Sequence, residues 1–242
     1  MNGFFDENGP FLWQPGTYAP QKNPFSWTNL TNMVWVDQPV GTGLGSAANG
    51  TPATITSEVQ VAQDFAGFWK NFMTTFDLTG RKVYITGESY AGQYIPYIAQ
   101  YMLQQNNTDY YNVNGIQIID PSIGDDNVLT YAPAVAQLNS QNNIFNLNSS
   151  FVESVNKRAD DCGFTAFMEE ALTFPPQGKF TAPNASAEGC AVWDDIATAA
   201  VYMNPCFNLY HVTDYCPFLW NQLGFPSLAI VCFLATHSMY KD

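Results

Sequence analysis

The sequence is short of basic residues and of histidine. It has 8 Lys and Arg residues against 21 Asp and Glu, a formal net charge of −13, and only two histidines. A field of this sign repels phosphate, which argues against nucleic-acid and anionic-membrane partners. An acidic composition can simply keep a protein soluble. It is also compatible with function at acid pH, where protonated carboxyl groups bring the net charge nearer zero. Two histidines and no Cys-x-x-Cys pair are too few for a usual zinc cluster, so we expect no metal site.

Long apolar runs are also missing. The longest late run, 228–235, is less than half of the roughly 20 residues that a membrane span requires. The first residues, 1–4, have neither the basic start nor the apolar core of a signal peptide. The chain is nevertheless 46% hydrophobic and 15% aromatic, which is ample for one large or two small folded domains.

Cysteines and glycosylation motifs indicate an oxidising compartment. All five cysteines lie in the C-terminal third, at Cys162, Cys190, Cys206, Cys216 and Cys232. Asn-x-Ser/Thr motifs occur at Asn29, Asn49, Asn106, Asn148 and Asn184. Together they favour a secretory route, so we expect that an N-terminal part with the signal peptide is absent. Cys162 and Cys190 are close enough in sequence to pair, as are Cys206 and Cys216, but spacing leaves the connectivity open.

The first half of the chain alternates between strand and helix patterns. Apolar, β-branched runs predict strands at 33–37, 82–86 and 115–121. Aromatic residues at three- and four-residue spacing predict a helix from Ser57, a candidate N-cap like Thr54, to Phe76. A second helix follows at 94–102. This alternation is typical of a parallel sheet covered by helices.

The pattern changes from about residue 125. Short amphipathic pieces at 152–158 and 167–172 alternate with loops rich in proline and glycine, and every cysteine lies in this part. We interpret it as a helical insertion or cap held by disulfides.

Ser89 lies between a predicted strand and a predicted helix. A sharp turn there would lift the serine Oγ out of the sheet and aim it at the helix N-terminus, which favours a developing oxyanion. The turn brings the residues two before and two after the serine together, so both must be small, and they are Gly87 and Ala91. The alternative is that Ser89 merely caps the second helix.

Four ordered blocks resemble the signature segments of serine carboxypeptidases, a family of α/β-hydrolase fold. They are Asp6–Phe11, Asn23–Trp27, Val36–Gly43 and Thr86–Gly92. The resemblance is strong over residues 4–125 and looser over 126–226. It implies an α/β fold with a mostly parallel sheet flanked by helices, and peptide or protein substrates with a free C-terminus. It implies no metal and no cofactor.

The resemblance also implies roles for single residues. Ser89 would attack the carbonyl of the C-terminal peptide bond. The backbone N–H of Tyr90 would donate to the oxyanion, and its ring would help to form a substrate subsite. Glu88 and Glu7 would belong to the carboxyl network that holds the substrate's carboxylate. A carboxyl group can donate to a carboxylate only when protonated, so recognition would favour acid pH. The alternative for both glutamates is a solvated carboxylate beside a loop.

Parts of the family pattern are absent. The glycine-rich block that supplies the second oxyanion donor should precede Asp6, and the Asp and His of the triad should lie beyond residue 242. Neither His211 nor His237 fits the missing base. Asp37 follows a strand that precedes Ser89, whereas the triad acid of a hydrolase follows the serine in the chain, so we interpret Asp37 as structural. We therefore expect a chain truncated at both ends and inactive by itself.

The sequence thus predicts three parts: residues 1–124 as the core with the nucleophile, 125–226 as the helical insertion, and 227–242 as a divergent tail not native to the family. The parent function would be serine carboxypeptidase activity in the secretory pathway, outside the cell or in a vacuole or lysosome. Two alternatives remain open. One is an esterase or acyltransferase on the same scaffold, and the other is a non-catalytic secreted binding protein.

Overall fold

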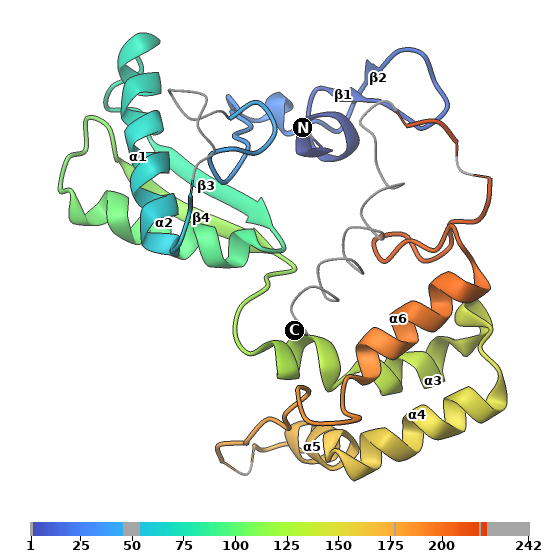
Figure 1. Cartoon of the computed structure of the whole chain (residues 1–242). Coiled ribbons are helices and arrows are strands. Elements are labelled where there is room, and N and C mark those ends of the chain that lie inside the picture. The colour runs from blue at the N-terminus through green and yellow to red at the C-terminus, as the bar shows by residue number, and fades with distance from the viewer. Residues whose placement is uncertain (1, 46–53, 177, 218, 222–242) are drawn as a thin grey trace. The chain divides into compact units, whose positions relative to one another are not determined.

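The computed structural model describes residues 2–45, 54–176, 178–217 and 219–221, which belong to two compact units (Figure 1). The first unit comprises Gly3 and Trp27–Ile123. The second comprises Asn2, Phe4–Ser26 and the described residues from Gly124 onward. The boundary between the units falls after Ile123, and residues 4–26 group with the second unit. The division into a core, a helical insertion and a tail stays a prediction. The tail at 227–242 lies outside the described residues.

The first unit is built on a pair of parallel strands. Strand β3 (Val83–Glu88) pairs with β4 (Val113–Ile119), with Ile85 opposite Ile116. Helix α2 (Ala91–Gln104) connects them and packs against both. This is the strand–helix–strand unit expected from the sequence, because a parallel pair requires a long crossover.

Helix α1 (Glu58–Thr75) packs on α2 (Figure 1). Ser57 caps it as predicted, because its Oγ accepts a hydrogen bond of 3.3 Å from the Gln60 N–H. Small side chains allow α1 and α2 to pack closely on one another. The buried core contains Ala62, Ala66, Val83, Ile85, Ile95, Ile98, Ala99 and Met102.

The strand predicted at 33–37 is not formed. The segment is extended, but it belongs to neither of the two sheets in the described part of the chain. Its apolar, β-branched residues have the side chains of a buried strand. A strand is defined by ladder pairing with a neighbouring strand, and neither sheet in the described residues extends to this segment.

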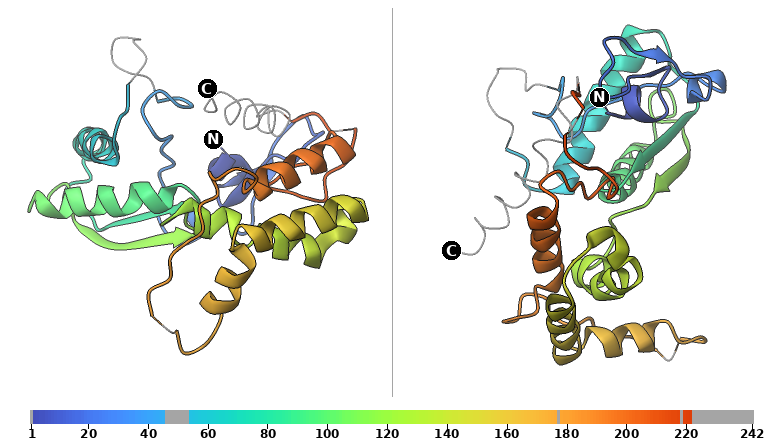
Figure 2. Two further views of the ribbon diagram at one scale, coloured as in Figure 1. Left: turned by 60° about the horizontal axis from the view of Figure 1, so that its bottom comes forward. Right: turned by 90° about the vertical axis from the view of Figure 1, so that its right-hand side faces the viewer.

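The second unit is mainly helical (Figure 2). It contains a short antiparallel pair, β1 (Phe11–Leu12) and β2 (Gln21–Lys22), and the π-helical turns η1 (Gly3–Glu7) and η3 (Asn127–Tyr131). Four helices follow: α3 (Ala134–Phe145), α4 (Ser149–Asp161), α5 (Phe164–Ala171) and α6 (Val192–Met203). Helices α4 and α5 cover the two amphipathic pieces predicted from the sequence, whereas α3 and α6 were not predicted.

Two disulfides hold this unit. Cys162, at the end of α4, bonds to Cys190, just before α6, and Cys206 bonds to Cys216. The structure therefore settles the pairing that spacing left open, and Cys232 lies outside the described residues. The core that the first disulfide borders buries Leu138, Val155, Phe164 and Val192.

Among the described residues, no helix combines the length and the apolar character needed to cross a bilayer. Of the predicted glycosylation sites, Asn49 is outside the described residues. The other four asparagines are exposed: Asn29, Asn106, Asn148 and Asn184. Their modification stays a prediction.

Candidate active site

Ser89 lies at the turn between β3 and α2, with a left-handed backbone. Its φ is 58°, a conformation that costs a non-glycine residue energy and is common at functional turns. The Ser89 N–H donates to the Ile119 carbonyl at 3.0 Å. The Ser89 carbonyl accepts from the N–H groups of Ser122 and Gly92, each at 2.9 Å. Three backbone hydrogen bonds therefore hold the strained residue in place.

The Ser89 hydroxyl is left exposed by this geometry. Within the described residues it makes no hydrogen bond to another group. The N-cap of α2 is Tyr90, and no side chain caps this helix. The capping alternative for Ser89 is therefore wrong. The serine instead projects from the turn beside the positive end of a helix dipole, where an oxyanion would be stabilised.

Gly87 and Ala91 meet across the turn, as the sequence predicted. A Cβ built on Gly87 would lie 2.6 Å from the Ala91 Cβ and 3.0 Å from the Ile95 Cδ1. Gly92 is confined in the same way, because its Cβ would lie 2.9 Å from the Pro121 Cβ. Both contacts are much shorter than the 3.5–4.0 Å at which carbon atoms pack. The turn therefore closes only with small residues at these positions.

Tyr90 is anchored by a residue that sequence reasoning missed. Its ring is 51% exposed, and its hydroxyl donates to Oε1 of Glu58, the first residue of α1, at 3.1 Å. Tyr94 packs edge-on against Tyr90, with ring centroids 4.9 Å apart. Burial, followed by the charge of Glu58 and the neighbouring Tyr90, raises the pKa of Tyr94. In the sequence Glu58 looks like an ordinary acidic residue in a helix's first turn.

The two predicted carboxylate-binding residues lie in different units. Glu88 is exposed at the end of β3, opposite Ile119. Glu7 is exposed at the end of η1 in the second unit, where its carbonyl accepts from the Asn23 side chain at 3.3 Å. Each unit is described by itself, so the joint role of Glu7 and Glu88 stays a prediction.

Asn23 organises the loop that carries Glu7. It is only 4% exposed, and its Nδ2 also donates to the Gly9 carbonyl at 2.9 Å. Its Oδ1 accepts from the Phe25 N–H at 2.9 Å, and the Ser26 hydroxyl donates to the Asn8 carbonyl. The first two signature blocks therefore bind one another through a buried amide.

Asp37 has the structural role expected for it. Its Oδ2 accepts from the Leu44 N–H at 2.8 Å, and this hydrogen bond lowers the pKa of Asp37 below its usual value. Gly43 passes so close that an added Cβ would lie 2.1 Å from the same carboxylate oxygen. The loop between them therefore wraps around the carboxylate.

His211 belongs to the second unit, whereas Ser89 belongs to the first. Its Nδ1 pairs with Asp214 Oδ1 in the loop closed by the Cys206–Cys216 disulfide, and the Asn208 side chain donates to Oδ2 of the same aspartate. This is a local contact between residues three apart. His237 lies outside the described residues, and within the described part no group of His, Cys, Asp and Glu could hold a metal ion.

Comparisons with known proteins agree with this geometry. A carboxypeptidase Y homologue of Arthroderma benhamiae is 54% identical over 226 residues, which are 93% of this chain and 44% of the relative. Serine-type carboxypeptidase F of Aspergillus niger is 45% identical over 230 residues, 94% of this chain and 43% of the relative. The chain thus spans less than half the length of these two relatives.

A solved structure confirms the fold. The crystal structure of Kex1(Δ)p, a prohormone-processing carboxypeptidase of Saccharomyces cerevisiae, superposes with a TM-score of 0.63 at 21% identity. The match covers 97% of this chain and 49% of that one. A sequence model described as serine carboxypeptidase, Peptidase_S10, matches residues 1–223. The strained serine between β3 and α2, the confined Gly87 and these matches together show that the chain belongs to the serine carboxypeptidase family, with an α/β-hydrolase fold.

Proposed function

We propose that Ser89 is the nucleophile of a serine carboxypeptidase, which removes C-terminal residues from peptides through an acyl-enzyme. The observation that supports this most is the strained turn, which presents the Ser89 hydroxyl without a competing hydrogen bond. Ser89 Oγ would add to the carbonyl carbon of the last peptide bond as it loses its proton to a base. The base would then pass this proton to the leaving amine as the C–N bond breaks, and water would hydrolyse the ester and release the shortened peptide.

Tyr90 would contribute to this step in two ways. Its backbone N–H, at the N-cap of α2, would donate to the oxyanion that forms when Ser89 attacks. Its ring would line the subsite beside the scissile bond. The hydrogen bond from the Tyr90 hydroxyl to Glu58 supports the second role, because it fixes the direction of an otherwise exposed ring.

Glu88 and Glu7 would bind the substrate's terminal carboxylate. Two carboxylates can approach only if a proton lies between them, so this recognition would be strongest at acid pH. The exposed position of Glu88, directly before Ser89, supports its part in the site.

We further propose that the 242-residue chain is inactive by itself. Within the described residues no base contacts the Ser89 hydroxyl, and His211 is paired with Asp214. A serine without its base is a poor nucleophile; in subtilisin, loss of the histidine alone lowers kcat about 10⁶-fold. The relatives' greater length leaves room for a base elsewhere in the full-length protein.

We place the protein in the secretory pathway, outside the cell or in a vacuole or lysosome. The two disulfides support this placement, because such bonds persist in oxidising compartments.

The test compares the full-length protein, its Ser89→Ala variant and the 242-residue chain on one peptide, made with a free C-terminus and as the C-terminal amide. We expect the full-length protein to release the last residue from the free acid only, and the other two proteins to be inactive. The matched control is Ser140→Ala, which removes an exposed hydroxyl that bonds only to its own helix. Equal cleavage of the amide would favour an esterase-like hydrolase, and an inactive full-length protein would favour a binding protein.

A further inference from the structure

Glu58 reaches from the first turn of α1 to the residue that follows Ser89. Its Oε1 accepts the hydrogen bond of 3.1 Å from the Tyr90 hydroxyl, across 32 positions of the sequence. Both residues belong to the first unit. Helix α1 begins at Glu58, Tyr90 is the N-cap of α2, and the two helices pack on one another. The contact therefore joins the N-terminal ends of two packed helices at the turn that carries Ser89.

Side chains of α1 fix the backbone around Glu58. The Ser57 Oγ accepts from the Gln60 N–H at 3.3 Å. The Gln60 side chain reaches back, so that its Oε1 accepts from the Thr56 N–H at 3.3 Å and its Nε2 donates to the Thr54 carbonyl at 3.1 Å. This exchange of hydrogen bonds is similar to a capping box. It holds the chain on both sides of Glu58, so the glutamate side chain starts from a defined position.

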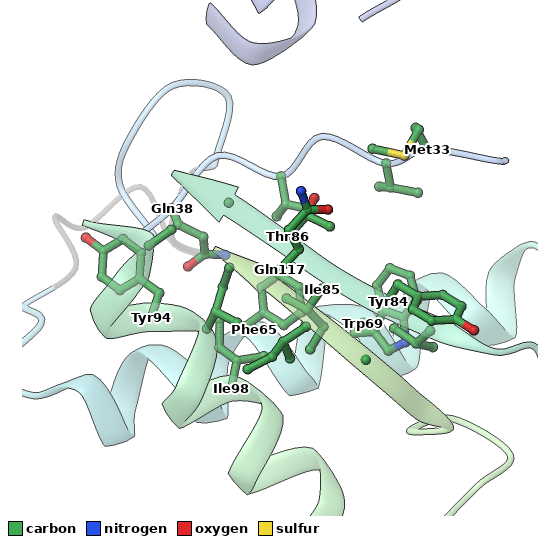
Figure 3. A pocket seen from close by; sticks show the side chains of 18 of the residues that line it. Met33, Gln38, Phe65, Trp69, Tyr84, Ile85, Thr86, Tyr94, Ile98 and Gln117 are labelled. Carbon is green, nitrogen blue, oxygen red and sulfur yellow. The ribbon is translucent and has the colours of Figure 1, made fainter. Parts of the chain in front are cut away.

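Tyr94 contacts the Tyr90 ring from a second direction. The two rings meet edge-on with their centroids 4.9 Å apart, and Tyr94 itself packs against the buried core of the first unit. Figure 3 shows the Tyr94 hydroxyl directed away from Phe65 and Ile98, which belong to the same packed region. A tyrosine side chain has only two torsions that place its ring. Contacts at the hydroxyl and at the ring therefore orient Tyr90, although it is 51% exposed.

The hydrogen bond between Tyr90 and Glu58 contributes little to the stability of the fold. It is exposed, and a hydrogen bond that replaces one to water has only a modest net effect. Its consequence is for ligands of the ring, because a side chain that is already oriented loses less conformational entropy when a ligand packs on it. Glu58 thus affects which ligands the Tyr90 ring binds and does not take part in bond making at Ser89.

We propose that Glu58 is a positioning residue that sets the preference for the penultimate residue of the substrate, by holding the Tyr90 ring as a wall for a large apolar side chain. This inference rests on the proposed function, in which the penultimate residue carries the carbonyl that Ser89 attacks and so lies beside Tyr90. A large apolar side chain packs well on an aromatic ring. A penultimate glycine has no side chain that could reach the ring, so its cleavage does not depend on Glu58.

The test compares two peptides, acetyl-Ala-Phe-Leu and acetyl-Ala-Gly-Leu, as substrates of the full-length protein. The readout is kcat/KM for the phenylalanine peptide divided by kcat/KM for the glycine peptide. We expect Glu58→Ala to lower this ratio about fivefold, as for one side chain that is no longer oriented before binding. Cleavage of the glycine peptide should not change. Glu58→Gln should keep the wild-type ratio, because it retains a carbonyl oxygen in the place of Oε1. Gln63→Ala, which shortens another exposed polar side chain of α1, is the matched control and should also keep the ratio.

Tyr90→Phe removes the same hydrogen bond from its other end and leaves α1 unchanged. It should lower the ratio as much as Glu58→Ala does, and the double variant Glu58→Ala/Tyr90→Phe should lower it no further. An equal loss on both peptides in Glu58→Ala would indicate a merely structural role and would overturn the proposal. Additive losses in the double variant would overturn it as well.

Binding measurements separate the role of Glu58 from the identity of the nucleophile. Calorimetric titration of Ser89→Ala with each peptide should show the same preference for phenylalanine, and Glu58→Ala/Ser89→Ala should lose it. If Ser89→Ala still cleaved the peptides with a ratio that depends on Glu58, the nucleophile would be wrong and the role of Glu58 would stand. If Glu58→Ala left the preference unchanged, the role of Glu58 would be wrong and Ser89 would be unaffected. A protein that neither bound nor cleaved the two peptides would overturn both.

Discussion

The close approach of Gly87 to Ala91 makes a quantitative prediction about the turn. In Gly87→Ala, the new Cβ would lie 2.6 Å from the Ala91 Cβ, about 1 Å inside the normal packing distance. Both carbon atoms are attached directly to backbone, so neither can rotate away. Overpacking of this kind costs about 1–3 kcal/mol, and we expect that loss in the free energy of unfolding.

Gly67 offers a matched control. It lies in α1, is exposed, and an added Cβ would meet nothing within 4 Å. Because alanine favours a helix over glycine, Gly67→Ala should stabilise the first unit by about 0.5–1 kcal/mol. The same chemical change is thus expected to have opposite signs at the two positions.

A second-site change isolates the contact. Ala91→Gly removes the clashing Cβ, so Gly87→Ala/Ala91→Gly should recover most of the loss, with a coupling energy of about 1 kcal/mol or more. The assay is urea unfolding followed by hydrogen exchange of peptides from Trp27–Ile123, which reports on the first unit by itself. If Gly87→Ala were as stable as Gly67→Ala, or if Ala91→Gly gave no recovery, the steric account of the turn would be refuted.

Three further changes test the structure elsewhere. The hydrogen bond from the Leu44 N–H lowers the pKa of Asp37, so the Asp37 carboxylate stabilises the fold above the unfolded pKa of about 3.9. Asp37→Asn should therefore lower the urea midpoint at pH 7. The difference between the variant and wild type should vanish as the pH falls through the lower pKa of the folded state. Replacing Cys162 and Cys190 by alanine opens a 28-residue loop and should cost about 3.6 kcal/mol of unfolding free energy by chain entropy, measured by urea titration of the oxidised proteins. Ser57→Ala removes the cap of α1 and should cost about 1 kcal/mol, with faster exchange of the first-turn amides.

Features fixed by local residues could be predicted from the sequence. The turn at Ser89 follows from a short β-branched run, small residues at Gly87 and Ala91, and an amphipathic helix, all within about twenty positions. The cap at Ser57 is equally local. The residue pattern was sufficient to predict both features because the residues that interact are close to one another in the sequence.

Features that depend on distant partners could not be predicted. Segment 33–37 has the side chains of a strand, but it belongs to neither sheet. Whether a segment pairs depends on a neighbouring strand, which the residues of the segment itself do not specify. The contact between Glu58 and Tyr90 joins residues 32 apart, and only the packing of α1 on α2 brings them together.

The central claim is that Ser89 is the nucleophile, and one measurement tests it most directly. The full-length protein is treated with a fluorophosphonate, digested, and the adduct is located by mass spectrometry, in parallel with measurement of the remaining carboxypeptidase activity. We expect a single adduct on Ser89, formed in step with the loss of activity. Complete inhibition with the adduct on another residue, or full activity in Ser89→Ala, would contradict the assignment.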